Sequence, residues 1–260
     1  YARPPQVLDS LSEALVDTYC ASPMGMTAEN LGAKYGITRE QADAFALRSQ
    51  QKWAAAQEAG RFTDEIVPVE VKQGKNVVTV TKDEHPRPQT TMETLAKLAP
   101  VFKKDGVVTA GNASGICDGA AMLVLTTAEH ARAKGWTPLA RLVQWGVAGV
   151  EPTLMGIGPA YAIPKALARA GLGQNDIDLF DINEAFAPQW LAVQKHLELP
   201  MEKCNVNGGA IALGHPLGAS GARLTATLLN AMEQRDAHLG LQVMCEAGGL
   251  ANATIIERLR

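Results

Sequence analysis

Three side chains in the second half of the chain, Asn183, His215 and Cys245, each follow a segment with the composition of a strand. His215 lies in the glycine-rich stretch 205–223, and Cys245 stands just before the turn 247–249. Successive members of the trio are separated by roughly 30 residues, about the length of one strand–helix–strand unit. Because open α/β sheets bind ligands at the carboxyl ends of their strands, we expect the three side chains to meet in one site.

An amide, an imidazole and a thiol can together catalyse a reaction of a thioester or a similar carbonyl compound. A cysteine beside an imidazole can act as a nucleophile or a base. Backbone N–H groups of a glycine-rich turn, helped by an asparagine amide or a histidine N–H, can hold a developing oxyanion. Structural roles are the alternative: Cys245 as a small buried hydrophobe, Asn183 as a helix N-cap and His215 as a satisfied histidine. The occurrence of all three groups at strand ends favours a site.

The second half alternates strands and helices in the order β-α-β-α-β-α-β-β. This order predicts an α/β fold, a mixed sheet with helices on its faces. Strands are expected at 138–150, 177–182, 203–207, 240–246 and 251–258, and helices at 159–171, 185–197 and 218–234.

The first part of the chain, about residues 1–116, lacks this alternation of strands and helices. We interpret it as an insertion in a sheet domain. Residues 8–18 have the spacing of a short amphipathic helix, Thr27 is expected to open a helix, and Thr38 with Gln41 forms a capping box for another. Two strands, at 66–71 and 77–80, predict a hairpin, with Pro68 on an edge strand. Thr90 and Glu93 are expected to cap a short helix. The apolar run 120–125 predicts a central strand, and Thr126 with Glu129 is expected to cap the helix that follows it.

Composition narrows the class of protein. The 260 residues carry a net charge of −3, so no basic field indicates nucleic acid as a partner. No apolar run approaches the ~20 residues of a membrane span. The four cysteines form no C-x-x-C pair, which argues against a zinc site and is typical of free thiols in a reducing compartment. Neither a dinucleotide-binding nor a P-loop glycine motif is present.

Several longer motifs together resemble the thiolases, coenzyme-A-dependent acyltransferases that cleave or form 3-ketoacyl-CoA. These motifs are MGMTAEN (24–30), TAGNASGICDGAA (109–121), MGIGP (155–159), NEAFAPQ (183–189) and NVNGGAIALGHPLGASGAR (205–223). The resemblance implies a thiolase-like layered fold with two similar halves and an inserted α+β loop domain. On that pattern, residues 1–116 correspond to the loop domain that binds CoA, 117–136 to the tail of the N-terminal half, and 137–260 to the C-terminal half.

The resemblance also implies residue roles. Cys245 matches the cysteine that abstracts or returns the α-proton of acetyl-CoA, and His215 the histidine that activates the nucleophile and contributes to an oxyanion hole. Asn183 matches the asparagine that holds a water in that hole, and the Ala247 amide is a candidate oxyanion donor. Coenzyme A enters as a substrate, with no permanently bound cofactor or metal. Its groove is expected to involve Met24, Arg87, Thr94, Ser114, Met155, Ala185 and Phe186.

Two departures from the family pattern stand out. None of Cys20, Cys117 and Cys204 lies in the family's nucleophile motif, so the acyl-accepting cysteine is expected upstream of Tyr1, in a longer polypeptide. Cys117 takes a place where the family often has asparagine, and is expected beside a strand rather than at its active end. The family sequence Cys-x-Gly-Gly-Gly is Cys245-Glu-Ala-Gly-Gly249 here, and repulsion from Glu246 is expected to raise the pKa of the Cys245 thiol.

The leading hypothesis is therefore thiolytic cleavage of 3-ketoacyl-CoA, because Pro23-Met24 resembles degradative members more than biosynthetic ones. The alternatives are an acetoacetyl-CoA-specific thiolase, an inactive relative that only binds CoA or acyl-CoA, and a Cys-His thioester hydrolase. The resemblance implies a homodimer or homotetramer. The last residues are Glu-Arg-Leu-Arg, without a peroxisomal Ser-Lys-Leu, which leaves the cytoplasm or the mitochondrial matrix as the expected compartment.

Overall fold

A mixed four-stranded sheet organises the second half of the protein. The computed structural model describes residues 7–259. In the sheet order β5-β8-β7-β6, the pair β6–β7 is parallel and the other two pairs are antiparallel. The strands are β5 (Ala140–Gly149), β6 (Leu179–Ile182), β7 (Leu239–Glu246) and β8 (Leu250–Arg258). Asn183 and Cys245 consequently lie at the same edge, where the parallel strands β6 and β7 end.

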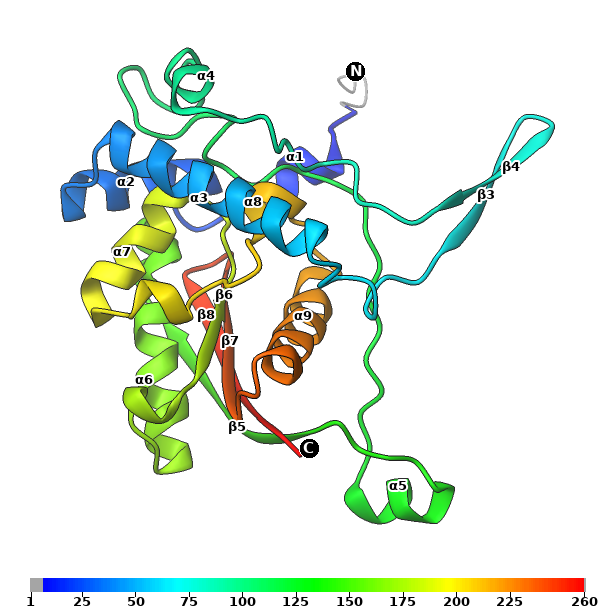
Figure 1. Cartoon of the computed structure of the whole chain (residues 1–260). Helices are drawn as coiled ribbons and strands as arrows, with labels where there is room; N and C mark the ends of the chain where they lie inside the picture. Colours follow the sequence, from blue (N-terminus) through cyan, green and yellow to red (C-terminus); the bar gives the residue numbers. More distant parts are fainter. Residues whose placement is uncertain (1–6, 260) are drawn as a thin grey trace, which may run out of the picture.

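Helices cover both faces of this sheet (Figure 1). On one face lie α6 (Pro159–Ala170) and α7 (Ala187–Leu197), and on the other lies α9 (Ser220–Gln234). The larger core packs Ile163 and Trp190 against Ile182 and Ile255, all at most 1% exposed. A second, smaller core packs Met232 of α9 with other buried apolar side chains, Leu179, Leu228, Ala231, Ala237 and Ile256. The arrangement is a layered α/β/α unit.

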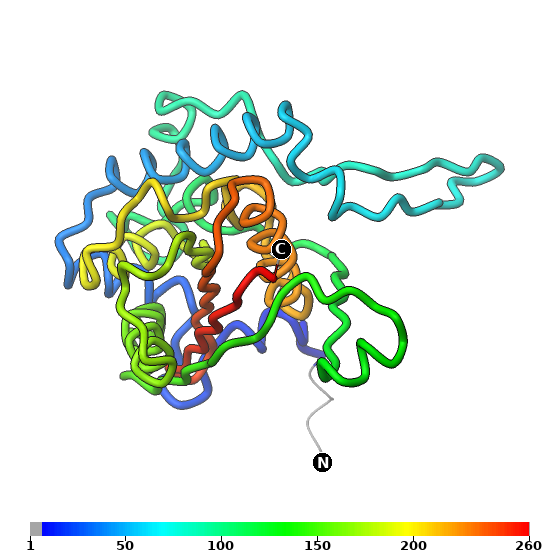
Figure 2. Tube along the Cα trace, turned by 60° about the horizontal axis from the view of Figure 1, so that its bottom comes forward, coloured from blue at the N-terminus to red at the C-terminus, as the bar shows by residue number. Residues whose placement is uncertain are grey.

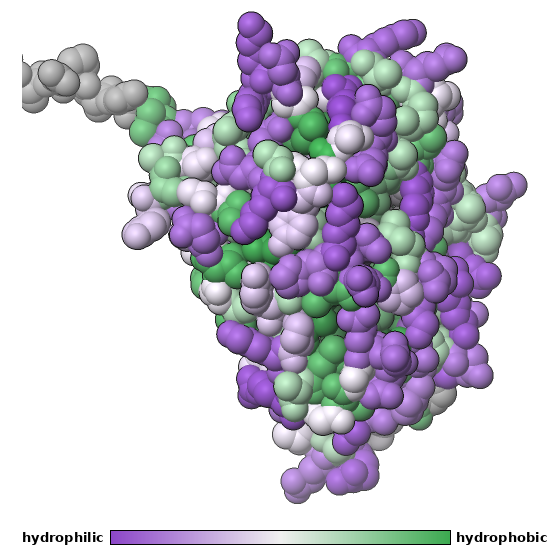
Figure 3. Space-filling model, turned by 90° about the vertical axis from the view of Figure 1, so that its left-hand side faces the viewer, coloured by the Kyte–Doolittle hydropathy of each residue, from purple (hydrophilic) through white to green (hydrophobic). Residues whose placement is uncertain are grey.

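The outer surface of the molecule is polar where the helices α2, α6 and α7 face solvent. Figure 3 shows this side covered mainly by hydrophilic side chains, with only narrow hydrophobic areas between them. The hydrophobic residues of these helices are therefore used inside, against the sheet, as an amphipathic pattern requires.

The first part of the chain lies over the edge of the sheet at which β6 and β7 end (Figure 1). The long helix α3 carries the capping box expected at Thr38 and Gln41, and both of its reciprocal hydrogen bonds are present. The elements of this part are α1 (Ser10–Ala14), β1 (Val16–Asp17), β2 (Ser22–Pro23), α2 (Met24–Tyr35), α3 (Arg39–Glu58), β3 (Val69–Gln73), β4 (Asn76–Val80) and α4 (Met92–Ala96). Helix α5 (Ala128–Lys134) follows them and lies near the opposite end of the strands (Figure 1).

The hairpin β3–β4 extends away from the body of the protein (Figure 2). All of its strand residues are exposed, including Val69 and Val77. The two strands pair only with each other, so the hairpin lies on no sheet of the body.

Some sequence predictions were wrong in detail. Residues 8–18 form only the short α1 before β1, and none of the α1 residues is buried. Helix α2 begins at Met24, before the expected start at Thr27, and Thr91 and Thr127 are the N-caps instead of Thr90 and Thr126. The segment 203–207 contributes only isolated bridges, among them a parallel one between Cys204 and Phe180.

The largest correction concerns the apolar run 120–125, which forms no strand and is exposed throughout, with Met122 at 89%. A strand needs a neighbour for its N–H and C=O groups. Within residues 7–259 no strand lies beside this run, which explains why its composition alone does not produce one.

Four short helices were not expected from the sequence. They are the 3₁₀ helices η1 (Pro152–Ile157), η2 (Gln174–Asp176) and η3 (Met201–Lys203) and the single turn α8 (Ala210–Leu213). None of the helices in the described residues is long and apolar enough to cross a membrane. Residues 7–259 also contain no cluster of His, Cys, Asp or Glu with the geometry of a metal site.

The close approach of β5 to α6 gives a test of this packing. A Cβ added at Gly146 of β5 would lie 2.5 Å from the Ala166 nitrogen and 2.7 Å from the Ala162 oxygen, both backbone atoms of α6. Because backbone cannot rotate away, we expect Gly146→Ala to lower the free energy of unfolding by about 1–3 kcal/mol. Gly218, which has nothing within 4 Å of its added Cβ, is the matched control. Equal stability of the two alanine variants in urea denaturation would contradict this packing.

Candidate active site

Asn183 and His215 lie in direct contact, as their spacing predicted. Asn183 Nδ2 is 3.3 Å from His215 Nε2. The Asn183 backbone N–H donates to the Val243 carbonyl of β7 at 2.9 Å, which extends the β6–β7 ladder by one residue and fixes the side chain at the strand end. Asn183 is only 1% exposed, and its Oδ1 has no hydrogen-bond partner among residues 7–259. That oxygen remains able to accept a hydrogen bond from a bound molecule.

A serine at the start of α9 defines the tautomer of His215. His215 Nδ1 lies 2.6 Å from Ser220 Oγ, and the Ser220 hydroxyl donates to the Pro216 carbonyl at 3.0 Å. Because the serine proton is used in that second bond, the Nδ1–H of the imidazole is the donor to Oγ. Nε2 then carries the lone pair and accepts from the Asn183 amide. Burial, with the charge of Arg223, lowers the pKa of His215 to about 4, so the imidazole is neutral at pH 7.

Cys245 lies in a small apolar cluster beside this pair. It packs with Met24, Met155 and Ala185, and Phe186 lies against the cluster. In the described contacts Cys245 shares no hydrogen bond with His215 or Asn183. Its connection runs through Ala185, which follows Asn183 closely in the chain, and through the paired ends of β6 and β7. Burial raises the pKa of the Cys245 thiol to about 12, and Glu246 adds to the rise, in the direction expected from the sequence.

The turn after Cys245 is held from the opposite end of the chain. The Gly248 N–H donates to the Asp17 carboxylate at 2.9 Å, and the same carboxylate accepts from the N–H groups of Tyr19 and Cys20. These bonds lower the pKa of Asp17. Gly248 and Gly249 have φ angles of 82° and 77°, the left-handed region that glycine adopts without strain. Ala247, the expected oxyanion donor, is exposed in this turn.

The loop 109–115 joins the two parts of the site through its backbone. The Ser114 N–H donates to the Ala185 carbonyl at 2.9 Å, and the Ala187 N–H donates to the Asn112 carbonyl at 2.8 Å. At the end of the loop, the Gly115 carbonyl accepts from the His215 N–H at 2.9 Å. The loop therefore sets the separation between the segment after Asn183 and the segment that carries His215.

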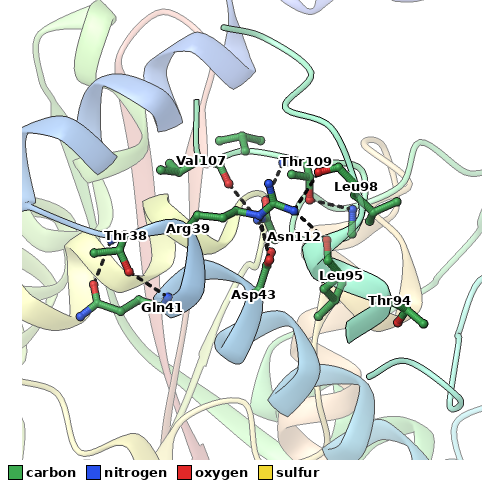
Figure 4. Close-up of polar contacts among 12 residues, drawn as sticks. Thr38, Arg39, Gln41, Asp43, Thr94, Leu95, Leu98, Val107, Thr109 and Asn112 are labelled. Atoms are coloured by element: carbon green, nitrogen blue, oxygen red, sulfur yellow. Dashed lines mark hydrogen bonds and ion pairs between the residues drawn. The ribbon is translucent and has the colours of Figure 1, made fainter. Parts of the chain in front are cut away.

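A buried carboxylate on α3 fixes that loop (Figure 4). Asp43, 2% exposed, forms an ion pair with Arg39 at 2.7 Å and accepts from Asn112 Nδ2 at 2.8 Å. Asn112 also donates to the Val107 carbonyl and accepts from the Thr109 N–H, so its amide is satisfied on both sides. Since Arg39 also donates to the carbonyls of Leu95 and Leu98, the network joins α3, α4 and the loop.

A second contact from α3 fixes the glycine-rich segment. Ser49 Oγ donates to Glu184 Oε2 at 2.5 Å and accepts from the Gly209 N–H at 3.1 Å. The Ile211 N–H of α8 donates to the same Glu184 oxygen at 3.3 Å. A Cβ at Gly209 would collide with the Glu184 carboxyl carbon, so this approach requires glycine. Glu184 is fully buried, which raises its pKa.

Comparison with known proteins was made with this geometry in hand. The family model "Thiolase, N-terminal domain" matches residues 5–129, and "Thiolase, C-terminal domain" matches residues 136–258. The chain belongs to the thiolase family.

Individual thiolases are similar over nearly the whole chain. The mitochondrial 3-ketoacyl-CoA thiolase of Mus musculus is 54% identical over 249 residues, which cover 96% of this chain and 63% of the mouse protein. The acetyl-CoA acetyltransferase of Escherichia coli K12 is 57% identical over 236 residues, 91% of this chain and 60% of that protein. The chain thus spans less than two thirds of the length of these curated relatives.

Solved thiolase structures confirm the expected fold class, an α/β layered thiolase fold. The crystal structure of the Bacillus anthracis acetyl-CoA acetyltransferase superposes with a TM-score of 0.96 at 49% identity, covering 99% of this chain and 66% of that one. Human mitochondrial 3-ketoacyl-CoA thiolase in complex with CoA superposes with a TM-score of 0.90 at 49% identity, covering 97% and 63%.

The residues expected along a thiolase CoA groove fall into two groups. Met24, Met155, Ala185 and Phe186 gather around Cys245, and Ser114 is bonded to Ala185. Arg87 and Thr94 lie apart from that cluster.

Both outlying residues are exposed and engaged locally. The Arg87 guanidinium donates to the carbonyls of Glu84, His85 and Pro86 in its own loop. Thr94 forms the capping box of α4 with Thr91. The Arg87 loop nevertheless reaches the glycine-rich segment, because His85 Nδ1 lies 2.8 Å from the Ala212 carbonyl.

The placement of Cys117 differs from the expectation that it lies away from the active end. A Cβ on Gly214 would collide with Cys117 Sγ, so the thiol lies against the residue that precedes His215. The reason is that the chain after Gly115 continues alongside the glycine-rich segment, as the contact between Gly119 and Pro216 also indicates. Burial raises the pKa of the Cys117 thiol.

The neutral state of His215 predicts a pH dependence of stability. Between pH 4 and 6.5 the unfolded chain binds a proton on this histidine that the folded chain does not bind, so the free energy of unfolding rises with pH in this window and levels off above it. We expect His215→Gln to reduce the gain between pH 5 and 7 by roughly 1–2 kcal/mol.

The measurement is urea denaturation at both pH values, with His130→Gln, at an exposed position, as the control. The buried acids Asp181 and Glu184 are common to all three proteins and cancel in the comparison. An unchanged slope in His215→Gln, or an equal change in His130→Gln, would contradict a neutral buried His215.

Proposed function

We propose that this chain supplies the proton-transfer and CoA-binding part of a thiolase-type acyltransferase that cleaves 3-ketoacyl-CoA into acetyl-CoA and a shortened acyl-CoA. The observation that carries the proposal is the Asn183–His215–Ser220 hydrogen-bond chain beside the buried thiol of Cys245. It supplies a neutral imidazole, whose Nε2 lone pair accepts from the Asn183 amide, and a protonated thiol at one sheet edge. The names of the relatives, 3-ketoacyl-CoA thiolase and acetyl-CoA acetyltransferase, support the same reaction class.

The protonation state of Cys245 suits the degradative direction. When the sulfur of the separate acyl-accepting cysteine attacks C3, its thiol proton passes to His215 Nε2, and the bond between C2 and C3 breaks. The acyl group stays on that sulfur as a thioester, and the electron pair goes to C2 and its thioester oxygen as an enolate. The Cys245 S–H then gives its proton to C2, which completes acetyl-CoA and leaves a thiolate. That thiolate regains a proton from the thiol of the incoming CoA. The CoA sulfur then attacks the acyl thioester and releases the acyl-accepting cysteine, which takes its proton back from His215. The N–H groups of Asn183 and Ala247 would donate to the enolate oxygen and lower its energy, whereas His215 Nε2 has no proton to donate in the tautomer that precedes the attack.

Within this proposal, CoA is a substrate and no permanent cofactor or metal takes part. Met24, Met155, Ala185 and Phe186 would contact the thioester end, and Ser114 the pantetheine. Arg87 would meet phosphate, because a guanidinium suits its geometry. The proposal assigns no acyl-accepting role to Cys20, Cys117 or Cys204, and keeps the nucleophile as a separate cysteine. The human thiolase solved with CoA supports CoA as the ligand class.

The same proposal divides the chain into 1–116 as loop domain, 117–136 as the tail of the N-terminal half, and 137–260 as the C-terminal half. The exposed apolar run 120–125 supports it, since this composition suits a strand that pairs outside the C-terminal sheet. Association into a homodimer or homotetramer is part of the proposal, supported by the projecting hairpin β3–β4 with its exposed valines. Relatives named as mitochondrial and bacterial support the matrix or the cytoplasm as the compartment.

The proton-transfer role can be tested without acyl transfer. In D₂O, the full gene product is expected to exchange the α-protons of acetyl-CoA, followed by NMR. Cys245→Ala removes the group that carries the proton, and we expect a loss of about 10²–10⁴-fold in exchange rate. Cys20→Ala, distant in sequence and outside the cluster, is the control. Wild-type exchange in Cys245→Ala would contradict the role.

Two alternatives give different results in the same experiments. An inactive CoA-binding relative binds acetyl-CoA reversibly and exchanges no protons. A Cys-His hydrolase releases acid from an acyl thioester when no free CoA is added, whereas a thiolase requires CoA to release the shortened acyl-CoA.

The alanine in the turn after Cys245 gives a further prediction. Ala247→Gly restores the family's glycine at an exposed turn position, so it removes a Cβ near the oxyanion without disturbing packing. We expect the thiolysis rate of the full gene product to stay the same or rise. A large loss of rate would show that the methyl group of Ala247 contributes to the site.

A further inference from the structure

A basic cavity of about 270 Å³ lies beside α3. Arg48 and Lys52, one turn apart on α3, and Arg235, at the end of α9, contribute three cationic groups to its lining. The remaining lining residues are Met201, Glu202 and Val206. The chain as a whole carries a net charge of −3, so this concentration of positive charge runs against the overall balance.

Two of the cations are held in place by backbone carbonyls. Arg48 Nη2 donates to the carbonyls of Met201 at 2.5 Å and Cys204 at 3.2 Å. Lys52 Nζ donates to the carbonyls of Cys204 at 2.9 Å and Asn205 at 3.3 Å. The Arg48 guanidinium also lies over the rings of Phe45 and Trp190. A ligand at this cavity would therefore meet cations that have already lost their side-chain freedom.

The positive charges in the cavity are compensated only in part, by the buried carboxyl of Glu184, which acts on Arg48 and Lys52 without forming an ion pair with them. Among the ion pairs of residues 7–259, none involves Arg48, Lys52 or Arg235. Glu202 is the one carboxylate of the lining, and it is exposed. Arg48 Nη1 is buried without a hydrogen-bond partner in the described part of the chain. Burial first, and then repulsion from Arg48, lowers the pKa of Lys52 to about 8.

We propose that this cavity is a binding site for a phosphate-bearing anion of diphosphate size. Guanidinium groups bind phosphate oxygens through paired hydrogen bonds, and an ammonium adds a point charge. A pocket of about 270 Å³ that is open to solvent accommodates a diphosphate. The anion is free diphosphate or the diphosphate of a nucleotide whose base stays outside.

The site is separate from the proposed CoA groove. Its cations bind the carbonyls of Cys204 and Asn205, at the start of the segment that leads to His215, whereas the apolar groove residues gather at Cys245. None of the proposed groove residues lines the cavity. Failure of the anion site would leave the proposed thiolase function untouched.

The test is isothermal titration calorimetry of the full gene product with pyrophosphate and, separately, with ADP. One saturable site is expected, and tighter binding of ADP than of pyrophosphate would identify a nucleotide as the source. Arg235→Gln, at an exposed position, and Lys52→Gln are each expected to weaken pyrophosphate binding about tenfold. Lys75→Gln, on the tip of the β3–β4 hairpin, removes the same charge elsewhere and should bind like the wild type.

Two results would overturn the proposal. One is wild-type affinity in both Arg235→Gln and Lys52→Gln. The other is loss of binding in Arg87→Gln with no loss in Arg235→Gln, which would assign the anion to the Arg87 loop instead.

Proton uptake on binding gives a second measurement. It depends on Lys52 itself, so the removal of a positive charge elsewhere in the protein would not change it. An anion beside Lys52 favours its charged form, so binding above pH 8 takes up a proton and the affinity should fall as the pH rises further. The other charged or titratable groups that act on Lys52 are Arg48, Arg235, Glu184 and Cys204, and Glu202 lines the cavity. Lys52→Gln should remove the fall, and an unchanged pH profile in that variant would count against the site.

Discussion

The hydrogen bond from Asn112 to the buried carboxylate of Asp43 is the contact on which the arrangement of the site depends. Asp43 is held by Arg39, and Asn112 holds the loop whose backbone bonds reach both Ala185 and His215. Leaving a buried carboxylate without its partner costs more free energy of folding than the hydrogen bond contributes when it is formed. The network therefore stabilises the fold only when all of its hydrogen bonds are made. His215 is thus positioned from α3, a helix far earlier in the chain, through a loop that bonds to α3 by the Asn112 side chain and to His215 by its main chain.

Burial, more than neighbouring charge, determines the protons of the site. Desolvation keeps His215 neutral and Cys245 protonated, since both charged forms would be unfavourable in these surroundings. The two effects are complementary, because one residue retains a lone pair and the other retains a proton. Packing of Met24 and Met155 around the thiol therefore determines its protonation state as well as the fold, and the Gly115 carbonyl holds the backbone of His215 in its buried position.

The sequence was sufficient for the four strands and three long helices of the second half and for the pairing of Asn183 with His215, but not for the segment 203–207, which forms only isolated bridges. The regular alternation of strand and helix patterns predicts these elements, and the spacing of the strand ends predicts that Asn183 and His215 meet. It was insufficient for the caps at Thr91 and Thr127, because each follows another threonine and either hydroxyl could accept from the first turn. The run 120–125 reads as a buried strand because composition reports hydrophobicity and not the presence of a neighbour.

Ser49, Asp43 and Asn112 were missed as site residues for a related reason. A short polar side chain on a helix or in a turn gives the same sequence pattern in three cases: when it caps a helix, when it faces solvent, and when it bonds to a segment distant in the sequence. Only the tertiary structure distinguishes the carboxylate of Asp43, bonded to Asn112, from an ordinary i, i+4 partner of Arg39.

Helix α3 serves three neighbours at once: the 109–115 loop through Asp43, the glycine-rich segment through Ser49, and the basic cavity through Arg48 and Lys52. What remains free on it is one stripe of exposed positions, Glu40, Ala44, Gln51, Ala55 and Glu58. We therefore expect substitutions in α3 to be tolerated only at the positions of that stripe. The rest of this helix would then vary as slowly through evolution as the segments that it holds in place.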